Sequence, residues 1–94
     1  MQIRWLRTAL RNLDEEITFI AAEDPQAAQR TLSRILEAIA LLETQPGLGH
    51  PGRVPGTREL VVANSRYLIP YRVNRQTIEI LRVFHTSRQN PHRW

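Results

Sequence analysis

The sequence predicts one α+β domain with the element order β-α-α-β-β-β, in which an antiparallel helix hairpin packs on a small, mostly antiparallel sheet. Three observations support this fold class. Apolar side chains recur at helical spacing through residues 8–42, and they alternate with polar ones through residues 57–85 as in half-buried strands. A segment rich in proline and glycine separates the two halves. Because two helices cannot bury both apolar stripes against each other, the sheet must cover the remainder.

The first strand and the first helix are expected at the N-terminus. A short strand covers residues Gln2 to Trp5, and Thr8 is positioned to cap the following helix by accepting hydrogen bonds from free backbone amides. This helix should end near Glu23. Its apolar stripe, at three- and four-residue spacing, consists of Leu10, Leu13, Ile17 and Ile20.

Asp24 and Pro25 mark the start of a second helix. Aspartate is a strong N-cap residue, and proline is tolerated at the first helical position because the amide that it lacks would be unpaired there. The two helices therefore form an antiparallel hairpin with facing apolar stripes. The stripe of the second helix consists of Ala28, Leu32, Ile35, Leu36, Ile39 and Leu42.

A loop and three strands complete the domain. Residues Pro46 to Gly56 contain three prolines and four glycines in eleven positions, which disfavours regular structure. Strands are expected near Thr57 to Val62, Tyr67 to Val73 and Thr77 to His85. Pro70 removes a ladder amide from the middle strand, and it therefore predicts an edge position or a bulge there.

Alternation predicts two distinct faces for the last strand. One face carries Ile78, Ile80, Arg82 and Phe84. The other face carries Glu79, Leu81, Val83 and His85. Residues Ser87 to Trp94 have no periodicity and are expected to form a short polar tail.

The composition limits the class of protein. The 94 residues suffice for a single domain, residues 1–94, and without cysteine neither disulfides nor thiolate metal sites can form. No apolar run is long enough to span a bilayer, and arginines interrupt the region where a signal peptide would be apolar, so we expect a cytoplasmic protein. His50 and His92 have no neighbours at ligand spacing, and no glycine-rich phosphate loop opens a helix. We therefore expect no metal and no cofactor.

All 13 basic residues are arginine, and they outnumber the 9 acidic residues. Arginine binds phosphate and carboxylate bidentately, which favours nucleic acid or an acidic protein as a partner. A GC-rich genome would also produce a chain without lysine. The acidic residues cluster between Asp14 and Asp24 while arginines gather in the strand half, so we expect a dipolar surface.

His85 and Arg88, at the end of the last predicted strand, are candidates for chemistry. A histidine beside an arginine can transfer a proton and bind phosphate during RNA cleavage. The histidine can equally close the sheet and hydrogen-bond a backbone carbonyl. The residues alone leave both interpretations open.

Four segments occur in an order that is typical of one family. Trp5 to Leu13 combines a strand ending in tryptophan with an Ala-x-x-x-Leu helix, Asp24 to Ala28 forms an Asp-Pro corner, and Pro46 to Gly52 is a proline- and glycine-rich loop. The strands then read Gly-Thr-Arg-Glu-Leu, Tyr-x-Ile-x-Tyr-Arg-Val and Ile-x-Ile-Leu-Arg-Val-x-His-x-x-Arg. In this arrangement, which covers nearly the whole chain, the sequence resembles the ParE-like branch of the RelE/ParE superfamily of small bacterial toxins.

The resemblance implies the toxin of a type II toxin–antitoxin system, which inhibits DNA gyrase and blocks replication by binding rather than by catalysis. It implies a target-binding surface formed by Arg58, Arg66, Arg72, Arg82, His85 and Arg88. The alternative is a ribosome-dependent mRNA endoribonuclease of RelE type, in which His85 and Arg88 would be the catalytic candidates. That branch carries Lys-x-Lys where this chain reads Glu59-Leu60-Val61, and arginine where it has Leu68, so the ParE-like interpretation is favoured.

The resemblance also implies a ParD-like ribbon-helix-helix antitoxin as the partner in a hetero-oligomer, with operator DNA bound only through the antitoxin. A segment of the antitoxin, disordered when free, would lay an apolar helix face into a groove of the toxin. The expected contact residues are Leu10, Leu13, Ile17, Ile35, Ile39 and Arg82. A toxin relic that retains only antitoxin binding is a third hypothesis.

Overall fold

The computed structural model describes residues 1–87 and Trp94. Two helices pack on a mixed, mostly antiparallel sheet that begins with an N-terminal strand, which confirms the predicted fold class. In chain order the elements are β1 (Gln2–Trp5), α1 (Arg7–Glu23), α2 (Pro25–Ala40), the 3-10 helix η1 (Leu41–Glu43), β2 (His50–Pro51), β3 (Arg58–Val61), β4 (Tyr67–Asn74), β5 (Thr77–Ile80) and β6 (Phe84–His85).

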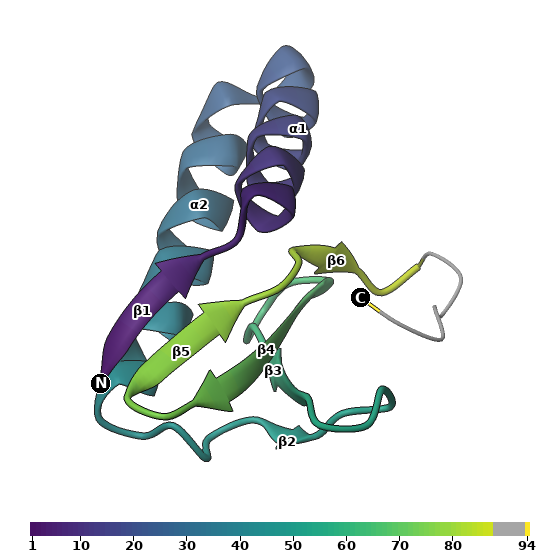
Figure 1. Cartoon of the computed structure of the whole chain (residues 1–94). Coiled ribbons are helices and arrows are strands. Elements are labelled where there is room, and N and C mark those ends of the chain that lie inside the picture. Colours follow the sequence, from purple (N-terminus) through teal and green to yellow (C-terminus); the bar gives the residue numbers. More distant parts are fainter. Residues whose placement is uncertain (88–93) are drawn as a thin grey trace.

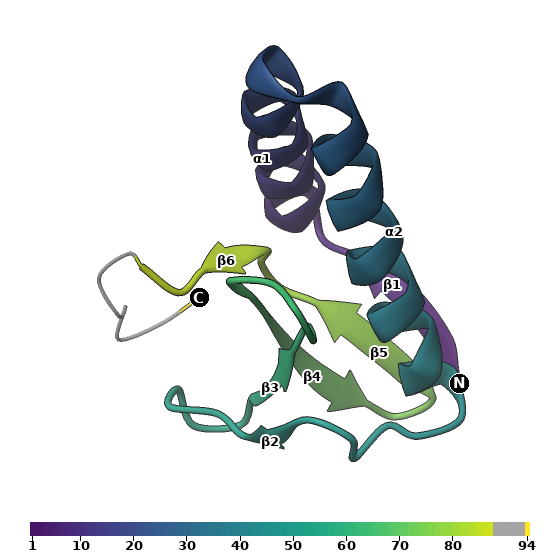
Figure 2. The ribbon, with the colours of Figure 1, turned by 180° about the vertical axis from the view of Figure 1, so that it is seen from behind.

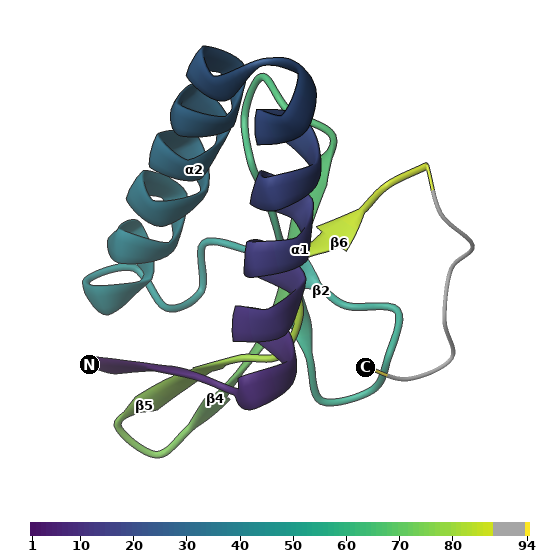
Figure 3. The same ribbon diagram turned by 90° about the horizontal axis from the view of Figure 1, so that it is seen from above.

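The sheet has the strand order β1-β5-β4-β3-β2, and β6 pairs with β4. β1 runs parallel to β5, with Gln2 opposite Thr77, whereas the other pairs are antiparallel. Figures 1 and 2 show the helix hairpin on one side of the sheet, with its tip extending beyond the strands. Seen from above in Figure 3, the two helices lie side by side.

α1 begins directly at the end of β1, and the predicted cap at Thr8 is wrong. The amide of Leu6 donates to the carbonyl of Ile80 at 3.0 Å and prolongs the parallel ladder, while the carbonyl of Leu6 accepts from the amide of Leu10 at 3.1 Å. Leu6 is therefore both the last paired residue of the strand and the N-cap, and its side chain makes no capping bond. Thr8 lies exposed inside the first helical turn.

α2 begins as the sequence predicts. The carboxylate of Asp24 accepts from the amide of Ala27 at 3.0 Å, and Pro25 is the first helical residue. An N-cap of this kind satisfies one of the otherwise unpaired amides of the first turn. The same residue ends α1, because its amide donates to the carbonyl of Ile20 at 2.9 Å.

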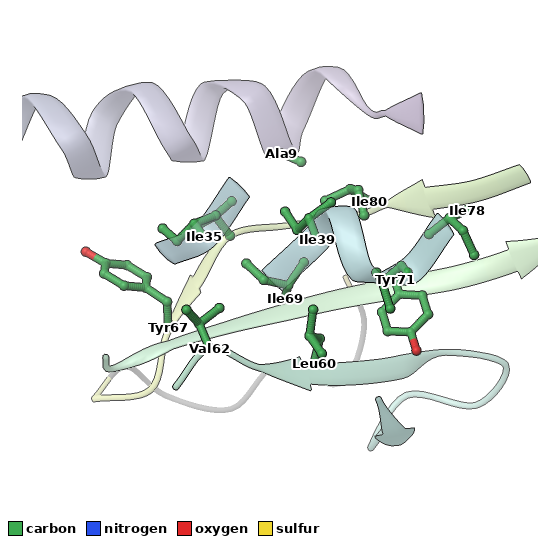
Figure 4. Close-up of a cluster of buried hydrophobic side chains, with 12 residues drawn as sticks. Ala9, Ile35, Ile39, Leu60, Val62, Tyr67, Ile69, Tyr71, Ile78 and Ile80 are labelled. Carbon is green, nitrogen blue, oxygen red and sulfur yellow. The ribbon is translucent and has the colours of Figure 1, made fainter. Parts of the chain in front are cut away.

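The core lies between α2 and the sheet (Figure 4). α1 contributes Ala9, which is fully buried, and the predicted stripe residue Leu10 is half exposed instead. Leu36, predicted on the stripe of α2, is likewise 44% exposed. The buried cluster consists of Ala9, Ile35, Ile39, Leu42, Leu60, Val62, Tyr67, Ile69, Tyr71, Ile78, Ile80 and Val83.

Pro70 lies in an interior strand and is accompanied by a bulge, so the second of the two predicted alternatives is confirmed. Tyr71 pairs with Ile80, and Leu68 pairs with Phe84. Ile69 and Pro70 of β4 therefore lie opposite three residues, 81–83, between β5 and β6. The carbonyl of Pro70 accepts from the amide of Leu81 at 2.9 Å, but proline has no amide to return the bond, and the ladder breaks there.

The bulge makes the predicted faces of the last strand wrong. One extra residue reverses the alternation, so the side chains after the bulge exchange faces. Val83 belongs to the same core cluster as Ile78 and Ile80, and His85 pairs with the core residue Tyr67. Phe84 therefore lies on the opposite face, where its ring meets that of Trp94 edge-on at 5.2 Å.

The proline- and glycine-rich loop is held on the sheet by a buried tyrosine. The hydroxyl of Tyr71 donates to the carbonyl of Pro46 at 2.8 Å and accepts from the amide of Gly49 at 2.9 Å. A β-carbon at Gly49 would lie 2.7 Å from the Tyr71 ring and 2.8 Å from the carbonyl oxygen of Glu59. Only glycine lets the loop approach so closely.

We expect Gly49→Ala to lower the free energy of unfolding by about 1–3 kcal/mol, because the added methyl group forces the loop away from Tyr71 and the backbone of β3. Urea denaturation measures this change. Gly47→Ala is the matched control, because a β-carbon there meets no atom within 4 Å and should change the stability by less than about 0.5 kcal/mol. Equal stabilities of the two variants would contradict the prediction.

Candidate functional site

The structure separates the predicted target-binding arginines onto two faces of the sheet. Arg58 pairs with Tyr71 on the helix side, and its Nε and Nη2 donate to the carbonyls of Gly49 at 2.8 Å and Gly47 at 3.1 Å. Arg72 follows Tyr71 in β4 and therefore points to the opposite face. There its Nε lies 2.5 Å from a carboxylate oxygen of Glu79. Both guanidinium groups already have intramolecular partners.

The remaining predicted arginines are also dispersed, so the expectation of a single arginine patch is wrong. Arg82 lies in the bulge, where Nη1 donates to the carbonyl of Trp94 at 3.4 Å and Nε is buried without a partner among the described residues. Arg66 is exposed in the turn between β3 and β4. Arg88 lies outside the described residues. Alternation within each strand does not give the register between strands, which sets Arg58 opposite Tyr71 and Arg72 opposite Glu79 and so places the two arginines on opposite faces.

A cavity of about 360 Å³, here called the notch, lies between α1, the β3–β4 turn and β6. It brings together Arg66 and His85, two of the predicted target-binding residues, with Glu16, Phe19 and Tyr67. Phe19 is 77% exposed at the rim. The notch thus combines a cation, an imidazole, a carboxylate and an exposed aromatic ring.

Hydrogen bonds and a ring contact fix Glu16, Tyr67 and His85 in the notch. The hydroxyl of Tyr67 donates to a carboxylate oxygen of Glu16 at 2.8 Å, which ties α1 to β4. The ring of His85 meets the ring of Tyr67 edge-on, with centroids 5.2 Å apart. Nδ1 of His85 accepts from the amide of Ser87 at 3.3 Å and lies 2.6 Å from its hydroxyl. With Nδ1 accepting, the ring proton is on Nε2, where it can donate to a partner.

Sequence patterns did not identify Phe19, Tyr67 or Glu16 as members of this site. Phe19 is an apolar residue outside the helical spacing of Leu13 and Ile20, and this irregularity was the one available signal. Tyr67 and Glu16 are 51 positions apart in the chain. Their contact follows from how α1 lies on the sheet, which a local pattern does not reveal.

The face of the sheet opposite the helices carries apolar side chains and, besides the pair of Arg72 and Glu79, a second ion pair. Glu59 is 1% exposed and accepts three hydrogen bonds from Arg53. The amide and Nε of Arg53 lie 2.9 and 3.0 Å from one carboxylate oxygen, and Nη2 lies 3.2 Å from the other. Leu68, Pro70 and Leu81 are buried nearby in the sheet. Arg53 satisfies this buried carboxylate and anchors the loop a second time.

Two of the predicted antitoxin-binding residues are buried in the core. Ile35 and Ile39 are at most 2% exposed and pack against the sheet, so they cannot contact a partner. Leu13 and Ile17 are half-buried, whereas Leu10 is half exposed. The expectation failed for α2 because a single apolar stripe cannot show which of its members the sheet covers. The other large exposed apolar residues are Phe19, Leu36, Leu41, Leu48, Val61 and Val73.

Within residues 1–87 and at Trp94, no group of three or more histidine, aspartate or glutamate side chains is placed to hold a metal ion. In the same part of the chain, no helix is both long enough and apolar enough to cross a membrane.

Comparisons with known proteins agree on one family. A family profile described as "ParE toxin of type II toxin-antitoxin system, parDE" matches residues 3–90. The chain is 48% identical over 90 residues to a putative toxin, Y4kP, of Sinorhizobium fredii (strain NBRC 101917 / NGR234), covering 96% of this chain and 93% of that protein. A solved structure of the chromosomal ParDE toxin–antitoxin system from P. aeruginosa superposes with a TM-score of 0.82 and 30% identity, covering 90% of this chain and 95% of the other.

We expect Arg53→Ala to lower the free energy of unfolding by about 3 kcal/mol, because it leaves the carboxylate of Glu59 buried without its cation. The same change in a Glu59→Gln background should cost less, since no charge is then left unpaired. Arg30→Ala, at an exposed position of α2, serves as the control. A double-mutant cycle by chemical denaturation measures the coupling, and additive effects would show that the pair contributes no stability of its own.

Proposed function

The chain belongs to the ParE toxin family of type II toxin–antitoxin systems, and from this premise we propose that it arrests growth by inhibiting DNA gyrase and is neutralised by a ParD-like antitoxin. The family match over residues 3–90 carries the proposal. Gyrase acts on chromosomal DNA, so the proposed place of action is the cytoplasm.

The chemistry of the sheet supports a toxin that acts by binding. A ribosome-dependent endoribonuclease needs cations that stabilise the charge developing in the transition state. At the positions where the RelE-type branch carries them, this chain has Glu59, whose carboxylate is neutralised by Arg53, and the buried Leu68. These contacts favour the gyrase-directed function over RNA cleavage.

We assign the notch to the target. Arg66 is an exposed cation beside the donor Nε2 of His85, and Phe19 offers an apolar anchor at the rim. Such a combination suits a protein surface on which a carboxylate lies next to an apolar pocket. Arg58 and Arg72, which bond to carbonyls and to Glu79, have fewer donors left for an external partner.

The proposed antitoxin complex is a hetero-oligomer in which the antitoxin alone contacts operator DNA. The chain has a formal net charge of +4, so an acidic segment of the partner would be attracted to it. On the helix hairpin the half-exposed Leu10 and the half-buried Leu13 and Ile17 are available to an apolar helix face.

We expect Arg66→Ala and His85→Ala each to weaken gyrase inhibition at least about tenfold, since each removes a charged or hydrogen-bonding group worth roughly 1.4 kcal/mol or more at an interface. The toxin concentration that halves supercoiling measures the effect. Arg30→Ala on α2 should leave that concentration unchanged, and thermal melting should show that all three variants fold. If both notch variants inhibit gyrase as strongly as the wild type, the target does not bind at the notch.

The function itself is tested with purified toxin freed from its antitoxin. We expect the toxin to inhibit supercoiling of relaxed plasmid by gyrase and to accumulate cleaved DNA with supercoiled plasmid, and the antitoxin to reverse both effects. Cleavage of translated mRNA on ribosomes without any effect on gyrase would establish the RelE-type alternative. Antitoxin binding without either activity would identify a toxin relic.

A further inference from the structure

A groove borders the outer edge of β3. Two adjoining cavities, of about 510 and 350 Å³, lie between the C-terminal half of α2 and this strand, and both are lined by Ala38, Leu41 and Ala63. Leu48, Leu60 and Val61 complete the apolar lining of the smaller cavity. Leu41, Leu48 and Val61 are 49%, 44% and 60% exposed, so the groove is an apolar surface open to solvent.

The backbone of β3 is paired on its outer edge over only half of its length. In the part of the chain that the structure describes, β2 pairs with Arg58 and Glu59 and does not reach Val61. On the inner edge, Leu60 lies opposite Ile69 and the amide of Val62 donates to the carbonyl of Tyr67 at 3.1 Å. Because backbone groups alternate between the edges of an antiparallel strand, the amide and carbonyl of Val61 point outward into the groove.

An unpaired strand edge beside an apolar groove suits one kind of ligand, an extended peptide. Its backbone would pair with Val61, and its alternate side chains would occupy the space lined by Leu41 and Leu48. β2 already pairs with the first half of the outer edge of β3. The ligand must therefore be short, and it must continue the line of β2 from the position before His50.

We propose that this edge receives a short, extended segment of the antitoxin, which adds a strand to the toxin's sheet at Val61. The inference rests on the proposed function for the existence of the antitoxin, and on the open edge for the mode of binding. This strand contact at Val61 is separate from the contact between an antitoxin helix and the helix hairpin. Arg34 and Glu37, both exposed, line the larger cavity, so the charges there balance and the net charge of +4 supplies only a general attraction for an acidic segment.

A second copy of the toxin does not fit this edge. An antiparallel, two-fold pairing centred on Val61 would place residue 63 of one copy opposite Glu59 of the other. β2 occupies that position, because His50 already pairs with Glu59. A flexible segment that enters the free half of the row avoids this collision.

Val61→Pro tests the backbone contact directly. Proline removes the outward amide but none of the bonds to β4, so the fold should survive, as it does for prolines at strand edges. We expect affinity for the full-length antitoxin, the product of the adjacent reading frame, to fall at least tenfold in titration calorimetry. Val61→Thr keeps the amide and should bind like the wild type. Both variants should inhibit gyrase normally, because Val61 does not line the notch.

Amide hydrogen exchange, measured by NMR on the wild-type complex, provides a readout that does not depend on the fold of a variant. The amide of Val61 should exchange quickly in the free toxin and at least tenfold more slowly in the complex. The amide of Val62, already bonded to Tyr67, should change little. If only amides of the helix hairpin are protected from exchange in the complex, the antitoxin binds but does not add a strand at Val61, and the proposal is overturned.

Two further outcomes separate this proposal from the function on which it rests. Complete failure of the wild-type toxin to bind the antitoxin would refute the proposed partner, and strand addition with it. Concentration-dependent protection of Val61 in the free toxin, together with a dimer in light scattering, would assign the edge to a second copy and overturn the proposal alone.

Discussion

Pro70 lies in β4, an interior strand of the sheet, where it offers a carbonyl oxygen but no amide proton. The neighbouring chain forms a bulge between β5 and β6, and this bulge decides on which face of the sheet the side chains after it lie. The extra residue carries Val83 into the core and brings His85 to the helix side, where its ring meets Tyr67. Without the bulge His85 would lie on the opposite face, and the notch would have no imidazole.

The parts of the fold that sequence could predict are those governed by local rules. Asp24 and Pro25 stop one helix and start the next through bonds within a few residues, and glycine and proline mark the loop. The errors arise where tertiary contacts decide. Leu6 replaces Thr8 at the start of α1 because its amide reaches Ile80, a bond across 74 positions that no local pattern contains.

The candidate site was predicted less well for a related reason. Arg66 and His85 reach the notch, but Arg58 and Arg72 bind loop carbonyls and a carboxylate on opposite faces. The sequence shows that arginines alternate along strands, but it does not show to which acceptors within the chain they will hydrogen-bond. Arg58, Tyr71 and Arg53 all hold the same loop, so the wall of the groove that contains Leu48 is held in place by bonds within the chain, which would lower the entropy cost of binding the proposed peptide.

The parallel pairing of β1 with β5 has a consequence for how the protein is made. Gln2 pairs with Thr77, which the ribosome adds 75 positions later. At about 5–20 residues per second, the first strand waits roughly 4–15 seconds for its partner. The core also lacks Ile78, Ile80 and Val83 until then. The nascent chain therefore cannot complete its sheet during most of its synthesis, and prematurely terminated fragments lack the folded toxin's surface.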